Sequence, residues 1–217
     1  MNLEQARFNM VEQQIRPWEV LDQDVLDLLY VVRREEFVGA EYRALAFSDI
    51  EIPLGSGERM WAPKVEARVL QALTAKKTEK ALEVGTGSGY FAALLAHRVH
   101  QVTSVEIDPR LEAFGEQNLQ RQGIDNVTVE LGDAAQGWAA RAPYDIIVIT
   151  GSTPVLPQPF LAQLKPGGRL FAIVGDAPIM EARLITCVAE GSHRSVNLFE
   201  TSFPPLRNAV QPKRFSF

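Results

Sequence analysis

The sequence predicts an α/β fold in which a doubly wound, mostly parallel sheet is covered by helices on both faces. From Lys80 onward, stretches typical of strands alternate with stretches typical of helices, as in parallel sheets. One stretch, residues 144–150, is an almost continuous apolar run, which is expected of a central strand buried on both faces. Three closely spaced glycines follow another predicted strand, and ligands of such folds bind where strands end.

The first part of the chain is predicted to be a helical lid over this core. Residues 21–29 have the apolar spacing of a helix behind a polar start, and residues 63–72 repeat that spacing. Between them, residues 47–54 alternate like a short strand. We expect the lid, residues 1–77, to pack on residues 78–217 within one structural domain.

The core is predicted to contain five strands in succession and then a hairpin. The strands are expected at residues 80–84, 102–107, 127–131, 144–150 and 168–174. The helices between them are expected at residues 89–98, 109–122, 134–140 and 157–164. Two further strands around a turn, residues 183–189 and 195–203, would add antiparallel edge strands at the C-terminal end of the sheet.

Composition favours a globular cytoplasmic protein. The chain has 217 residues, of which 46% are apolar and 23% charged. Its net charge of −5 argues against a nucleic-acid partner held through phosphate contacts. It contains neither a secretory signal nor an apolar run of the ~20 residues that cross a bilayer. The single cysteine, Cys187, excludes an internal disulfide, and the three histidines lack clustered partners, so no metal site is expected.

The most informative stretch of the sequence is a glycine-rich loop after the strand at residues 80–84. Its glycines occupy alternate positions, Gly85, Gly87 and Gly89. Glycines at this spacing let the backbone turn tightly and approach a ligand closely. The dinucleotide fingerprint G-x-G-x-x-G is not matched, because its third glycine would fall at Tyr90. Glu83 would repel a pyrophosphate but suits a cationic ligand such as an ammonium group, which disfavours a nicotinamide dinucleotide.

The pattern E-x-G-x-G-x-G resembles motif I of the methyltransferases that use S-adenosyl-L-methionine (SAM) as their cofactor. In those enzymes this region holds the methionine end of SAM. The resemblance implies that the cofactor is contacted by Glu83, Gly85, Thr86, Gly87, Ser88, Gly89 and Tyr90. It also implies a Rossmann-like fold for the core.

Two later strand ends extend the predicted cofactor site. Glu106 ends the second strand about 20 residues after the glycine loop, where a carboxylate can accept both ribose hydroxyls, and Ile107 follows it. The third strand ends at Gly132, Asp133 and Ala134, where such methyltransferases usually contact adenine. A Gly-Asp pair also occurs in ordinary turns, so by itself it is weak evidence for an adenine site. The prediction for residues 132–134 therefore relies on the glycine loop and Glu106.

Longer segments resemble the protein-L-isoaspartate O-methyltransferase family. The matching segments are residues 32–38, 45–49, 52–55, 82–90, 104–106, 132–133, 142–145 and 163–170. The similarity extends from about residue 9 to residue 175. It implies that the chain transfers a methyl group from SAM to the carboxyl of L-isoaspartyl residues in damaged proteins or peptides. The ester would then collapse to a succinimide, which starts repair of the damaged residue.

The chain departs from this family at one important position. The family's Thr-Ile-Ser-x-Pro segment corresponds to residues 59–63, so Trp61 stands where the active-site serine is expected. We expect Trp61, Thr150 and Ser152 to form the acceptor pocket; helix capping before Pro154 is the other role open to Ser152. The indole either closes the pocket by packing or reshapes it for another acceptor.

The missing serine does not remove an essential base. A carboxylate acceptor, with a pKa of ~4, is already ionised at neutral pH, so the serine would serve mainly in positioning. Two alternatives to isoaspartyl repair remain open. One is a methyltransferase for a different, possibly small-molecule, acceptor, and the other is a SAM-binding regulator without catalytic activity.

Overall fold

The computed structural model describes residues 2–55 and 57–212, and it contains a seven-stranded mixed sheet with helices on both faces. The strand order is β5-β4-β3-β6-β7-β8-β9. The strands are β3 Lys80–Val84, β4 Gln101–Glu106, β5 Val127–Leu131, β6 Tyr144–Thr153, β7 Leu164–Asp176, β8 Ile179–Ala189 and β9 Ser192–Thr201. The first five are parallel, whereas β8 and β9 pair antiparallel, which confirms the predicted fold class.

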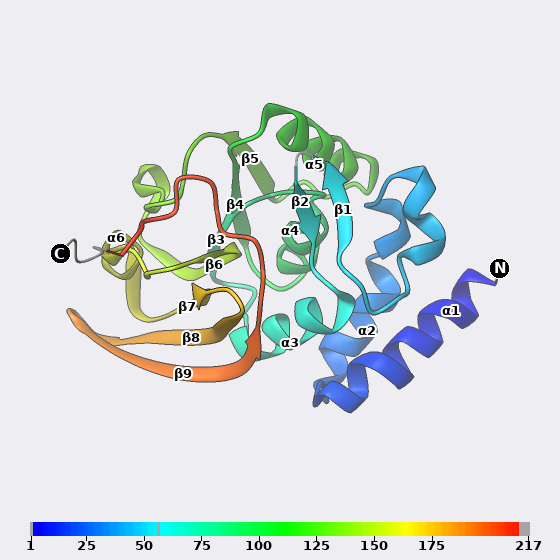
Figure 1. Ribbon diagram of the computed structural model, residues 1–217, viewed down its shortest axis with the longest axis horizontal. Coiled ribbons are helices and arrows are strands. Elements are labelled where there is room, and N and C mark those ends of the chain that lie inside the picture. The colour runs from blue at the N-terminus through cyan, green and yellow to red at the C-terminus, as the bar shows by residue number, and fades with distance from the viewer. Residues whose placement is uncertain (1, 56, 213–217) are drawn as a thin grey trace.

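The N-terminal part is mostly helical and carries one small hairpin (Figure 1). Its helices are α1 Leu3–Met10, the π-helical turn η1 Val11–Ile15, the 3-10 turn η2 Arg16–Trp18, α2 Gln23–Val31, the 3-10 turns η3 Arg34–Glu36 and η4 Ala40–Leu45, and α3 Pro63–Leu73. The hairpin pairs β1 Ile52–Gly55 with β2 Glu58–Met60. Sequence signals explain the helix starts, since Asp22 caps α2 through the amides of Asp24 and Val25, and α3 begins at a proline.

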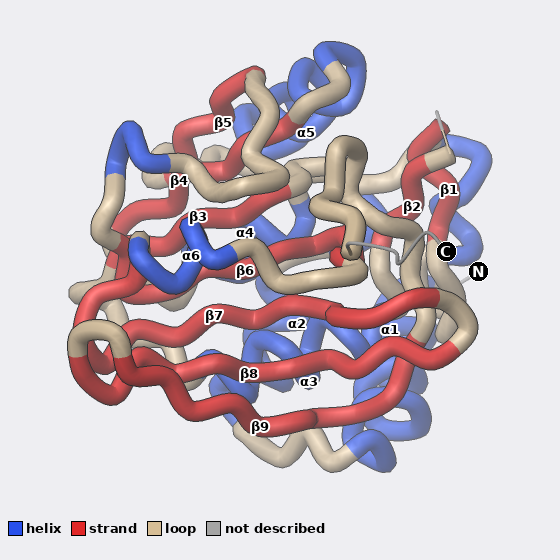
Figure 2. The backbone as a smooth tube through the Cα atoms, turned by 60° about the vertical axis from the view of Figure 1, so that its left-hand side comes forward, coloured by secondary structure: helices blue, strands red, loops and turns tan. Residues whose placement is uncertain are grey.

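The central strand β6 is buried on both faces, as its apolar run predicts. Ile146 and Val148 belong to one hydrophobic cluster, and Ile147 and Ile149 belong to the other. The helices α1, α2 and α3 lie behind the sheet in Figure 2, and α6 (Gln158–Ala162) lies in front of it. The remaining helices are α4 Tyr90–Ala96 and α5 Pro109–Arg121.

The first hydrophobic cluster joins the N-terminal part to the sheet. Leu26, Phe37 and Leu70 share it with Ala92 of α4 and Ile146 of β6. This continuity is the basis on which we propose that residues 1–77 and 78–217 form one structural domain. No helix among the described residues is both long and apolar enough to cross a bilayer.

Two predicted helices differ from the structure. Residues 134–140 do not form an α-helix, because Gly137 adopts a φ of +98°, and only the short 3-10 turn η5, Ala139–Arg141, follows. The helix expected at 157–164 is shorter, because Leu164 already pairs with Tyr144 at the start of β7. The predicted C-terminal hairpin is confirmed, although β8 begins four residues earlier than expected.

Candidate functional site

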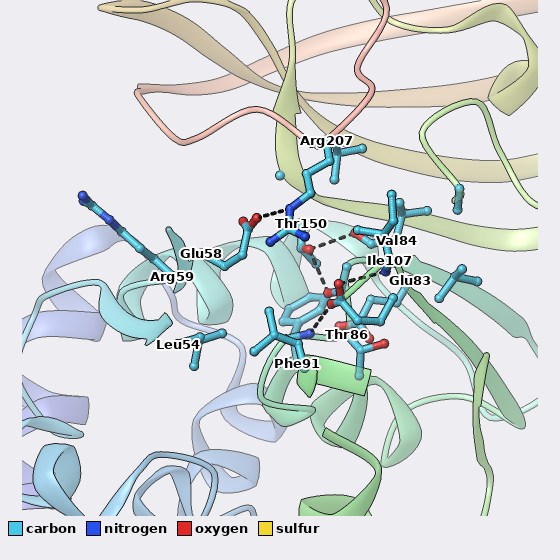
Figure 3. A pocket seen from close by; sticks show the side chains of 18 of the residues that line it. Leu54, Glu58, Arg59, Glu83, Val84, Thr86, Phe91, Ile107, Thr150 and Arg207 are labelled. Carbon is cyan, nitrogen blue, oxygen red and sulfur yellow. Dashed lines mark hydrogen bonds and ion pairs between the residues drawn. The ribbon is translucent and has the colours of Figure 1, made fainter. Parts of the chain in front are cut away.

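One cavity lies at the carboxyl ends of the parallel strands, where ligands of doubly wound sheets bind. It is a concave site lined by residues from both the N-terminal part and the core, the kind of place where small molecules bind. Val84 ends β3, Glu106 ends β4 and Gly132 follows β5, and all three line it. Figure 3 shows side chains from distant parts of the chain around this cavity.

The glycine loop forms one wall of the cavity. Gly85, Thr86, Gly87 and Ser88 line it, as the sequence predicts. Gly85 has a φ of +98°, and an added Cβ atom would overlap the hydroxyl of Thr150. Only glycine therefore fits at this point of the loop.

Thr150 supports the loop from the neighbouring strand. Its hydroxyl lies 2.8 Å from the carbonyl oxygen of Val84 and 2.9 Å from that of Gly85. The side chain also lines the cavity. Because the hydroxyl proton is engaged by these carbonyl groups, the structure gives Thr150 a positioning role for the loop.

Glu83 is a buried carboxylate beneath the loop. Its Oε2 accepts a hydrogen bond from the Ser104 hydroxyl, which in turn lies 2.6 Å from Thr86 Oγ1. Its Oε1 has no hydrogen-bond partner among the described residues. Burial, with added repulsion from Glu106 and Glu66, raises the pKa of Glu83 to about 8. An orphaned buried carboxylate in a cavity wall fits a ligand that carries a positive charge.

Glu106 is held by backbone amides. Its Oε2 accepts from Gly87 N at 2.9 Å, and its Oε1 accepts from the amides of Ile107 and Asp108 at 2.9 and 3.0 Å. Glu106 and Ile107 both line the cavity. A carboxylate fixed in this way beside a glycine loop is suited to bind the two hydroxyls of a ribose.

The segment after β5 forms the next part of the wall. Gly132, Asp133 and Ala134 all line the cavity, as predicted. Asp133 Oδ1 accepts from the amide of Ala135 at 2.9 Å, which makes an Asx turn, and its Oδ2 accepts from Asn208 Nδ2 at 2.8 Å. The Asp133 carboxylate is thereby held in one orientation.

Trp61 also lines the cavity and is 4% exposed. Its indole makes edge-on contacts with three rings, those of Phe91, Phe171 and Phe203, at centroid distances of 5.3, 5.7 and 6.2 Å. Within the described residues, its Nε1 atom has no hydrogen-bond partner. Trp61 is therefore a packed residue of the wall that also carries an unused donor.

Ser152, predicted for the acceptor pocket, is not among the residues that line the cavity. Its hydroxyl donates to the carbonyl oxygen of Phe203 at 2.7 Å, and its amide donates to that of Pro204 at 2.9 Å. Its own carbonyl accepts from the amide of Leu206 at 2.9 Å. Ser152 instead anchors the segment after β9 to the sheet.

Gly89 and Tyr90, predicted to contact the cofactor, are also not among the described residues that line the cavity. Gly89 faces α5, and an added Cβ atom would lie 2.9 Å from the carbonyl oxygen of Gly115. The ring of Tyr90 is buried in the core, where the guanidinium of Arg34 lies 5.2 Å from its centroid. Both residues help to start α4, whose packing turns them away from the cavity.

The sequence does not single out several charged residues of the wall. Glu66 of α3 is 2% exposed and paired with Arg34, although a glutamate in an amphipathic helix usually faces solvent. Glu58 and Arg207 form an ion pair of 3.0 Å at the mouth, as the dashed line in Figure 3 shows. No local signal in the sequence indicates these long-range pairs.

The wall carries more negative than positive charge. The acidic residues are Glu58, Glu66, Glu83, Glu106 and Asp133, and the basic residues are Arg59 and Arg207. Such a surface favours a ligand with a net positive charge over a nucleotide phosphate. The described residues contain no group of three histidines, cysteines or acids that could hold a metal ion.

Structural comparison shows the fold. One solved structure of a protein-L-isoaspartate O-methyltransferase superposes with a TM-score of 0.80 at 24% identity, covering 94% of this chain and 65% of that one. A Plasmodium falciparum protein solved with S-adenosyl-L-homocysteine (SAH) superposes with a TM-score of 0.76 at 21% identity, covering 91% of this chain and 96% of that one.

Sequence comparison shows the family. The chain is 39% identical over 191 residues to protein-L-isoaspartate O-methyltransferase 1 of Syntrophobacter fumaroxidans, which covers 88% of this chain and 89% of that protein. It is 37% identical over 209 residues to protein-L-isoaspartate O-methyltransferase 2 of Pelobacter propionicus, covering 96% and 93%. A family model matches residues 5–211. The chain therefore belongs to the protein-L-isoaspartate(D-aspartate) O-methyltransferase family.

Proposed function

We propose that the protein is a SAM-dependent methyltransferase that methylates the carboxyl of L-isoaspartyl residues in damaged proteins or peptides, as a step of protein repair. Family membership supports the activity. The observation that carries the cofactor assignment is the buried carboxylate of Glu83, which lines the cavity and has one oxygen without a hydrogen-bond partner among the described residues. This arrangement suits the ammonium group of the methionine end of SAM.

The proposed cofactor site follows the cavity wall. Glu83 and the loop from Gly85 to Ser88 would hold the methionine end, Glu106 with Ile107 the ribose, and Asp133 with Gly132 and Ala134 the adenine. The hydrogen bonds that fix Glu106 and Asp133 support these roles, since both carboxylates are oriented before any ligand arrives. When bound, SAM supplies a methyl group on a positively charged sulfur.

The residues of this chain contribute orientation and exclusion of water. An isoaspartyl carboxylate, with a pKa of ~4, needs no general base at neutral pH. The rings of Trp61, Phe91 and Phe203 give the proposed acceptor side an apolar wall from which water is excluded. We assign Trp61 to this side, with Thr150 setting the position of the loop opposite it.

The second candidate function is methylation of a different acceptor, such as a small molecule. It is favoured by one observation, the presence of a large indole where the family has a serine hydroxyl. Isoaspartyl proteins or peptides remain the proposed partners. We propose neither a nucleic-acid nor a membrane partner, and we propose a cytoplasmic location.

The experiment that tests this proposal measures transfer of a labelled methyl group from SAM to a short isoaspartyl peptide, with the matching aspartyl peptide as control. Selective, base-labile incorporation would support carboxyl methylation. Binding of SAH without transfer to this peptide would contradict the repair assignment and favour another acceptor or a regulatory role. Failure to bind SAH at all would overturn the cofactor assignment itself.

A further inference from the structure

The cavity wall contains a second buried carboxylate besides Glu83. Glu66 lies on α3 and lines the cavity, although it is only 2% exposed. Glu83, on β3, lines the same cavity. The charge of Glu66 adds to burial and to the charge of Glu106 in raising the pKa of Glu83.

The partners of Glu66 leave one of its oxygens free. Its Oε2 is paired with Arg34 Nη1, and no hydrogen bond to its Oε1 occurs within the described residues. Arg34 also donates from Nη2 to the carbonyl oxygen of Trp61 at 2.6 Å and lies over the ring of Tyr90. Arg34 is not among the residues that line the cavity, so it holds Glu66 from behind.

Each carboxylate therefore presents an oxygen without a partner. Glu83 Oε1 is buried and unpartnered among the described residues, and the side chain is 0% exposed. A cation that donates hydrogen bonds in several directions would satisfy both oxygens. A primary ammonium has three donors on one small charged centre, and its hydrogen bonds to carboxylates are strong.

We propose that Glu66 and Glu83 together bind the α-ammonium group of the cofactor, so that Glu66 is a cofactor-binding residue. This inference rests on the proposed function, because it concerns the same cavity. It goes further because it assigns the ammonium group a second binding residue, which comes from the N-terminal part of the chain. Cofactor binding would then connect α3 directly to the end of β3.

The experiment compares two ligands that differ in the amino-acid part of the cofactor, which carries this ammonium group together with the carboxylate. SAH carries the ammonium, whereas 5′-methylthioadenosine keeps the adenosine and the sulfur but lacks the amino-acid part. Calorimetric titration gives the Kd of each ligand for the wild type, Glu66→Gln, Glu83→Gln and Glu116→Gln. Glu116 is exposed on α5, so its substitution makes the same chemical change away from the cavity.

We expect Glu66→Gln to raise the Kd of SAH about tenfold or more, because one partner of a buried charge-assisted contact is lost. The Kd of 5′-methylthioadenosine should stay at its wild-type value, and Glu116→Gln should change neither. If Glu66→Gln weakens both ligands equally or neither, the inference is overturned. If Glu83→Gln alone weakens SAH selectively, the proposed function stands and only the role of Glu66 fails. A wild type that binds neither ligand overturns the proposed function as well.

A second variant allows for a folding defect in Glu66→Gln, which leaves the guanidinium of Arg34 buried without its carboxylate. The double variant Arg34→Gln/Glu66→Gln replaces the ion pair with two amides that can hydrogen-bond to each other. The same selective loss of SAH affinity is expected in it, because Arg34 does not line the cavity. Wild-type affinity for SAH in the folded double variant would contradict the inference.

Discussion

The guanidinium of Arg207 lies 3.0 Å from the carboxylate of Glu58, and this ion pair joins the segment after β9 to the β1–β2 hairpin across the mouth of the cavity (Figure 3). A second contact of Arg207, at 3.2 Å, reaches Asp108 at the start of α5. The mouth is thus bordered by three segments that are distant in sequence and connected through one side chain. Both members of the pair are between 33% and 39% exposed.

We expect Arg207→Ala to increase the rate at which SAH dissociates, because the contact between the two sides of the mouth is lost. Half-exposed ion pairs contribute about 1 kcal/mol or less, so the increase should be about fivefold or smaller. Stopped-flow displacement of SAH measures this rate. Exchanging the charges, with Glu58→Arg and Arg207→Glu together, should recover part of the effect. If SAH dissociates from Arg207→Ala at the wild-type rate, the ion pair between Glu58 and Arg207 does not slow the release of SAH.

The raised pKa of Glu83 predicts a dependence of stability on pH. Burial raises it from 4.5 to about 8, with repulsion from Glu106 and Glu66 adding to the effect. Between these values the unfolded chain carries an ionised Glu83 while the folded protein keeps it protonated. The unfolded state then binds fewer protons, so this group lowers the free energy of unfolding as pH rises from about 4.5 to about 8.

The variant Glu83→Gln isolates this contribution. Its Tm should rise relative to that of the wild type as pH increases through this window, and the difference should level off above it. Thermal unfolding in the absence of ligand, at intervals from pH 5 to pH 9, measures the difference. A constant difference across the range would contradict a protonated Glu83 in the folded protein.

Thr150→Val should weaken SAH binding by about 1–2 kcal/mol, because two loop carbonyl groups lose their shared hydroxyl partner while the side chain keeps its size. Isothermal titration measures the loss. Thr153→Val is a matched control on the same strand, since the Thr153 hydroxyl also donates to a backbone carbonyl, that of Val155 at 2.7 Å, but does not line the cavity. Equal losses of SAH affinity in both variants would contradict a specific role for Thr150.

Gly85→Ala should abolish SAH binding. The new Cβ atom would overlap the Thr150 hydroxyl, and a φ of +98° is unfavourable for alanine. Gly123→Ala separates the two causes, because Gly123 has a φ of +66° and no atom within 4 Å of an added Cβ. It should lose about 1–2 kcal/mol of stability and keep its affinity for SAH. Retained SAH binding in a folded Gly85→Ala variant would refute the close approach.

Trp61→Ala should lower the free energy of unfolding by about 3–5 kcal/mol, because it leaves a cavity among Phe91, Phe171 and Phe203. Urea denaturation measures the change. Trp18 is only half-buried, so Trp18→Ala should cost less. A smaller loss for Trp61→Ala than for Trp18→Ala would mean that the indole does not hold the aromatic cluster together.

The sequence predicts those parts of the candidate site whose residues are placed by local structure, such as the end of a strand. Glu83, Gly85 and Glu106 lie at strand ends, so their type and spacing suffice to place them. Ser152 does not line the cavity with Thr150. The pairing of β6 with β7 shifts register between Val148 and Ser152, so the alternation of side chains along a regular strand does not give the direction of the Ser152 side chain.

Other parts of the site depend on contacts that no local pattern contains. Glu66 is buried by Arg34, which lies 32 positions away, and Arg207 meets Glu58 across 149 positions. Gly89 and Tyr90 share the loop motif, but the packing of α4 decides which side of it they face. The sequence also indicates a turn at residues 55–57 and does not decide between a packed and a disordered tail at residues 212–217. Ser56 and residues 213–217 lie outside the described residues.

The anchoring of residues 203–208 to Ser152 has a consequence for synthesis of the protein. Phe203, Pro205, Leu206 and Arg207 form part of the cavity wall, and Asn208 holds Asp133. A growing chain on the ribosome can assemble the parallel strands before these residues emerge, but its ligand site still lacks one side. The complete wall forms only after translation of this segment, so ligand binding stabilises the finished protein rather than the early stages of its folding.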